Sequence, residues 1–102
     1  MKYCLVLQWP ASSIDDYDAM IEAEDALIRG LGEGNEVDGH DAGSSEVNIF
    51  IRTDDPKQAF RQLEAILRSR GSWDAVRIAY REVNASQYTV LWPKGLTRFD
   101  VT

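Results

Sequence analysis

Residues 36–50, EVDGHDAGSSEVNIF, hold the side chains of this sequence that are best suited to chemistry. They include the single histidine, His40, with Asp38 and Asp41 beside it and Glu46 shortly after. Imidazole and carboxylates bind divalent metals, and a histidine oriented by a carboxylate can act as a general base. The stretch has neither the H-x-x-x-H nor the paired-cysteine spacing of a closed metal site, and Ser44 is not on the elbow that exposes a catalytic serine. We therefore expect no metal, no cofactor and no catalytic residue here.

Glu24 is the second unusual residue, because it falls near the middle of an apolar stripe. The stripe has helical spacing and consists of Ile14, Tyr17, Met20, Ile21, Leu27, Ile28 and Leu31. A carboxylate in such a stripe costs free energy unless a partner satisfies it. Either the helix is bent so that Glu24 reaches water from the edge of the stripe, or Glu24 pairs with His40 or an arginine.

Two interpretations of the polar stretch stay open. In the first, it is a glycine-containing hairpin whose Asp and Ser side chains bond to their own backbone. In the second, it is a polar site in which His40 pairs with at least one carboxylate, and this is the site that we predict. The candidate site residues are Glu24, Asp38, His40, Asp41, Glu46, Asn48 and Phe50.

Strands and helices alternate along the chain in a simple order. Branched and aromatic residues or an apolar-polar alternation predict strands at residues 3–9, 36–41, 45–53, 75–83 and 88–93. A first helix begins at a cap, Ser12 or Ser13, and runs to about Arg29. A second helix follows the cap Asp55 and ends before Gly71.

This order predicts one domain over residues 1–102 with an α+β fold. The specific expectation is a ferredoxin-like split βαβ sandwich, β-α-β-β-α-β plus a short C-terminal strand, with both helices on one face of an antiparallel sheet. On strand 45–53, Val47, Ile49 and Ile51 should face the helices. The alternate residues, among them Asn48 and Phe50, should lie on an opposite face left open, and the tail 94–102 has no periodic pattern.

The composition restricts the classes of partner. With 44% hydrophobic and 27% charged residues the chain is typical of a folded protein. Its net charge of -6 disfavours nucleic acid and anionic membranes and favours a basic protein partner. The single Cys4 and the short N-terminal apolar run favour a cytoplasmic protein with no export signal or membrane span. An open face bearing Phe50, together with an exposed edge strand, favours a homodimer.

The stretch VDGHDAGSSEVNIFIRTDDP, residues 37–56, resembles a recurring element of small uncharacterised bacterial proteins. The resemblance covers about a fifth of the chain and implies a bacterial cytosolic protein. Compact acidic proteins of this kind include immunity proteins, which neutralise toxins. The expected function is a protein-binding module, with an immunity protein as its specific form, that uses acids of the 36–48 hairpin and the first helix. The alternative is a small enzyme or ligand-binding protein with a polar site around Glu24, His40 and neighbouring acids.

Overall fold

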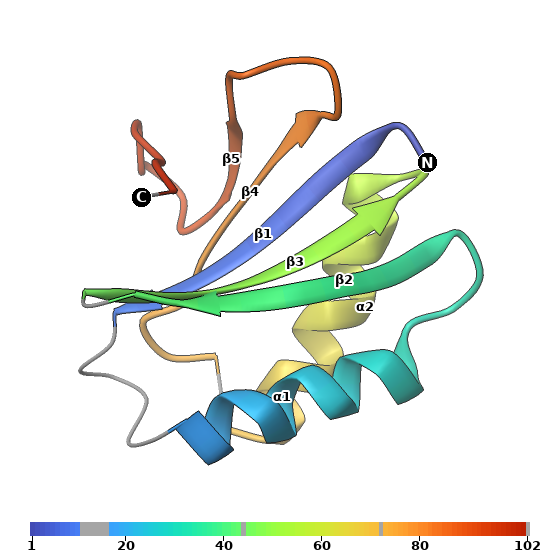
Figure 1. Ribbon diagram of the computed structural model, residues 1–102, viewed down its shortest axis with the longest axis vertical. Helices are drawn as coiled ribbons and strands as arrows, with labels where there is room; N and C mark the ends of the chain where they lie inside the picture. Colours follow the sequence, from blue (N-terminus) through green and yellow to red (C-terminus); the bar gives the residue numbers. More distant parts are fainter. Residues whose placement is uncertain (11–16, 44, 72, 102) are drawn as a thin grey trace.

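The computed structural model describes residues 1–10, 17–43, 45–71 and 73–101, and in these it is an α+β protein (Figure 1). Its elements are β1 (Tyr3–Pro10), α1 (Tyr17–Gly30), β2 (Asn35–Ala42), β3 (Glu46–Thr53), α2 (Pro56–Ser69), β4 (Arg77–Glu82) and β5 (Thr89–Trp92). Every strand and helix expected from the sequence is present, with bounds shifted by a few residues. The cap expected at Ser12 or Ser13 lies outside the described residues.

The strands form one sheet in the order β2-β3-β1-β4-β5, and every neighbouring pair is antiparallel. The chain leaves β1, passes through α1 and returns as β2 on the far side of β3. In the same way α2 carries the chain from β3 to β4 on the far side of β1. As a result β2 and β5 are the two edge strands of the sheet in the described part of the chain.

Both helices cover one face of this sheet, which we call the helix face (Figure 1). Alternate residues of the three inner strands, β3, β1 and β4, point to it, because side chains alternate along a strand. The buried core there includes Leu5, Leu7, Trp9, Val47, Ile49, Ile51, Ile78, Met20, Leu27, Leu63 and Leu67. The inward positions predicted for strand 45–53 are therefore confirmed.

The second helix begins as its sequence predicts. Asp55 has an extended backbone, with φ -144° and ψ 97°, and its side chain accepts a hydrogen bond of 3.2 Å from the Gln58 amide. Pro56 then takes the first turn, where its missing N–H leaves no intrahelical bond unmade. Gly71 follows the helix with φ +74°, a conformation that glycine adopts without a steric penalty.

The opposite face of the sheet is not left open, which corrects the expectation from the sequence. The C-terminal tail, residues 97–101, crosses it, and we call it the tail face. Phe99 is buried against Val6 and Ala79, and Phe50 and Val101 pack around them. Gln8 Nε2 donates a hydrogen bond of 2.8 Å to the Asp100 carbonyl. Residues 97–101 form no helix or strand, so their sequence has no periodic pattern. They are held in place by these tertiary contacts.

Candidate functional site

The structure brings Glu24 and His40 together on the helix face. Nδ1 of His40 lies 3.1 Å from both carboxylate oxygens of Glu24. The side chains are 26% exposed for His40 and 11% exposed for Glu24, so the contact is shielded without being sealed from water. It is an ion pair when the imidazole is protonated and a hydrogen bond from Nδ1–H in the neutral tautomer that carries that proton. The misplaced charge of the first helix thus has its partner in the polar stretch.

Local geometry explains why these two residues meet. The chain reverses direction between α1 and β2, so β2 runs back alongside the helix. His40 is paired in register with Ile49, a core residue of the helix face, so its ring also points toward α1. The register of β2 against β3 shifts between Val37 and Gly39, and Gly39 has φ +130°. A bulge of this kind redirects the following side chains, and glycine accommodates it without strain.

The other candidate residues lie apart from this pair. Asp38 contacts Arg52, with 3.4 Å between Oδ2 and Nε, and both side chains are about half exposed. Asp41 is exposed and is paired in register with Asn48, on the opposite side of the sheet from His40. Phe50 packs in the tail-face cluster. The seven candidates therefore form no single site, because β-strand alternation sends neighbouring residues to opposite faces.

Asn48 belongs to a buried amide pair that the sequence did not reveal. Gln8 Nε2 donates 3.1 Å to Asn48 Oδ1, and both residues are 1% exposed. Nδ2 of Asn48 is buried and has no hydrogen-bond partner among the residues that the structure describes. Glu46 is also buried, near the start of the same strand. Gln8 and Asn48 sit opposite each other in the β1–β3 register, but 40 residues separate them in the chain, so only the strand pairing could have predicted their contact.

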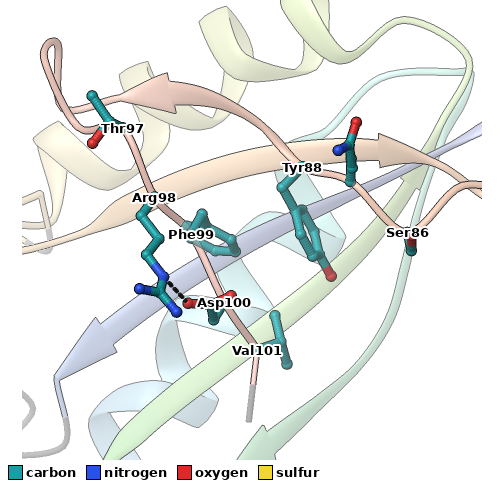
Figure 2. A pocket seen from close by; sticks show the side chains of 8 residues that line it. Ser86, Tyr88, Thr97, Arg98, Phe99, Asp100 and Val101 are labelled. Carbon is teal, nitrogen blue, oxygen red and sulfur yellow. Dashed lines mark hydrogen bonds and ion pairs between the residues drawn. The ribbon is translucent and has the colours of Figure 1, made fainter.

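A cavity of about 570 Å³ opens on the tail face between the loop before β5 and the C-terminal tail (Figure 2). Its lining residues are Ser86, Gln87, Tyr88, Thr97, Arg98, Phe99, Asp100 and Val101. The Tyr88 and Phe99 rings are 5.1 Å apart at their centres. Figure 2 shows Arg98 turned toward Asp100, whose carboxylate it contacts at 3.0 Å. Both side chains of this ion pair are largely exposed, at 87% and 61%, so the pair contributes little to stability.

Negative charge is concentrated in one segment. Residues 17–43 contain eight acids and one arginine, a net charge of -7, so the rest of the chain sums to +1 against the total of -6. Most of these acids are exposed: Glu22, Asp25, Glu33, Glu36, Asp38 and Asp41. α1 and β2 therefore present an acidic surface, whereas the arginines are concentrated in the later part of the chain.

Two features are absent from the described residues. No group of three or more His, Cys, Asp or Glu side chains in them could hold a metal ion. No helix in the same residues has the length and apolar character needed to cross a membrane.

No protein-family model, curated protein or solved structure matches this chain.

Proposed function

We propose that this protein is a small binding module that recognises a basic surface on a partner protein. The observation that carries the proposal is the charge of residues 17–43, which is -7 in a protein of net charge -6. Such a surface attracts a basic partner during encounter and repels anionic ones such as nucleic acids. The acids of α1 and β2 are the binding residues in this proposal.

An immunity protein that neutralises a bacterial toxin is the specific form of the proposal. The resemblance of residues 37–56 to small bacterial proteins supports it, and so does the position of that element at the acidic surface. A bacterial, cytoplasmic protein belongs to the same proposal. Neutralisation would follow from covering the toxin's basic surface.

The test is capture of a partner from a lysate of the source organism, with paired charge reversals. The variant Asp25→Lys/Glu36→Lys removes two acids of the proposed surface, and Asp74→Lys/Glu82→Lys removes two exposed acids elsewhere. The total charge changes equally in both. We expect a basic protein to be retained by the wild type and the second variant and lost by the first. Equal retention by both variants would contradict the proposal. Addition of the wild type should also inhibit the purified partner's activity.

A second candidate function is binding or conversion of a small ligand at His40. The specific observation in its favour is the 3.1 Å contact with Glu24, because a carboxylate can orient an imidazole for proton transfer. NMR titration with a panel of small metabolites would test it, since saturable shifts centred on His40 and absent in His40→Gln are required.

For the fold we propose the ferredoxin-like class. The order β2-β3-β1-β4, with α1 and α2 each connecting strands that are separated by one antiparallel strand, supports it. β5 would then be an addition at the edge. An experimental structure with a different strand order would overturn this assignment.

A further inference from the structure

A groove lies between the last turns of α1 and the first half of β2. It encloses about 290 Å³ and is lined by Leu27, Ile28, Leu31, Asn35, Glu36 and Val37. Because α1 and β2 run in opposite directions, the Glu24–His40 contact lies beyond one end of this lining and ties the helix to the strand there.

The groove has an apolar floor and an unusually exposed wall. Leu27 is fully buried, while Leu31 and Val37 are partly buried against the core. Ile28 is 58% exposed. Among the described residues, Met1 is the only other large apolar residue that is exposed. Ile28 lines the same recess as Leu27, Leu31 and Val37, and a contiguous apolar surface, unlike a single exposed side chain, marks an interaction site. Covering it would contribute favourable free energy in proportion to the apolar area removed from water.

The free edge of β2 borders this groove. β2 ends the strand order of the described sheet, so one of its sides has no neighbouring strand. An extended segment can add to such an edge through main-chain hydrogen bonds, with alternate side chains on the two faces. On the helix face those side chains would meet Ile28 and Val37. On the other face they would meet the acids of β2, since Glu36 is paired in register with Arg52 and Asp41 with Asn48.

Charge determines which segment fits the edge. Glu36 and Asp41 are exposed on β2, and Asp25 and Glu33 are exposed on either side of Ile28 in the sequence. A second copy of β2 would place acids against acids, which disfavours self-pairing along this edge. A strand that carries lysine or arginine at alternate positions would instead meet opposite charge.

We propose that the α1–β2 groove and the free edge of β2 bind an extended segment of a basic partner protein, in which apolar residues alternate with Lys or Arg. The apolar residues occupy the groove beside Ile28, and the cations face the acids of β2. This inference rests on the proposed function and adds the binding mode and the chemistry of the segment.

The test uses a seven-residue amidated peptide that alternates lysine with valine and isoleucine, followed by fluorescence anisotropy and amide NMR. We expect saturable binding, with shifts confined to β2 and the last turns of α1. Ile28→Ser should weaken binding about tenfold, whereas Ile28→Leu, which keeps the apolar contact, should stay within about twofold. Glu36→Lys should also weaken binding about tenfold, and Glu82→Lys, at an exposed acid of β4, should not. Circular dichroism would show that each variant is folded.

Three results would overturn the inference. One is equal binding of a peptide in which serine replaces the apolar residues, and another is an unchanged affinity in Ile28→Ser. The third is the absence of any shift in β2, which includes the case of no peptide binding. Each is distinguishable from failure of the proposed function, because the paired charge reversals measure capture of the whole partner and leave Ile28 intact. If Asp25→Lys/Glu36→Lys loses the partner in the lysate experiment and Ile28→Ser has no effect, the acidic surface remains the proposed binding surface and the groove is rejected as part of it.

Discussion

The Glu24–His40 contact on the helix face and the Gln8–Asn48 contact on the tail face both place polar groups beside apolar packing, and they are satisfied in different ways. Glu24 and His40 lie near an edge strand, and their side chains remain 11% and 26% exposed. Gln8 and Asn48 lie on the inner strands β1 and β3 and are 1% exposed. The Glu24–His40 pair retains some contact with water, whereas the amide pair depends on protein groups.

The amide pair is also less completely satisfied. Gln8 Nε2 is shared between Asn48 Oδ1 and the Asp100 carbonyl, at 3.1 and 2.8 Å, while Asn48 Nδ2 has no hydrogen-bond partner in the described part of the chain. An unmade hydrogen bond of a buried donor costs about 1–3 kcal/mol. Packing of the tail must offset that cost, and Phe99 is its buried anchor. We therefore expect the stability of the tail face to depend mainly on Phe99. The Glu24–His40 contact, which we call the edge contact, should depend on both of its residues together.

The largest effect is expected from Phe99→Ala. Loss of this side chain removes the aromatic contact with Tyr88 and the packing on Val6 and Ala79, and should lower the free energy of unfolding by about 3 kcal/mol. Urea denaturation measures the change. Thr97→Ala, at an exposed position of the same tail, is the control and should stay within about 0.5 kcal/mol. A loss below about 1 kcal/mol for Phe99→Ala would show that the tail contributes little to the fold.

An intermediate effect is expected at the edge contact. His40→Ala leaves the mostly buried Glu24 carboxylate without this partner and should cost about 1–2 kcal/mol. A double-mutant cycle with Glu24→Gln should give a coupling energy of about 1 kcal/mol. The Asp38–Arg52 pair is the matched control, since its 3.4 Å contact joins side chains that are about half exposed and should couple by less than about 0.5 kcal/mol. Equal coupling in the two cycles would contradict the argument from burial.

The sequence offered the edge contact as one of two alternatives, because Glu24 is a charged residue within an apolar helical stripe. The chain has one histidine that could pair with this carboxylate. The strands and the cap of α2 were predictable because apolar-polar alternation and the Asp-Pro pair are patterns of residues close together in the sequence. The inward and outward positions of β3 followed from strand alternation once the helices were assigned to one face.

The tail face could not be predicted in this way. Gln8 lies inside an apolar strand where a single amide breaks no period, and its partners are 40 and 92 residues away. Residues 97–101 form no helix or strand, so no pattern shows that Phe99 returns to cover Val6. The seven candidate residues do not lie together, because the sheet places alternate positions of a strand on two opposite faces.

The smallest effect on stability is expected from Cys4, which lies on the tail face in β1, the strand that also carries Gln8. Burial raises the pKa of its thiol above the ordinary value, and the positive charges of Arg81 and Arg52 oppose that shift. Because the folded pKa is the higher one, the thiol stabilises the fold below the unfolded pKa, about 8.5, and this contribution is lost as pH rises through the folded pKa. Between pH 8 and pH 10.5 the wild type should therefore lose slightly more stability than Cys4→Ser, in which the other titrating groups are unchanged. Parallel urea titrations at the two pH values measure the difference. If Cys4→Ser loses as much stability as the wild type, the arginines balance the burial of the thiol, and the tail face shields Cys4 less than it shields the amide pair.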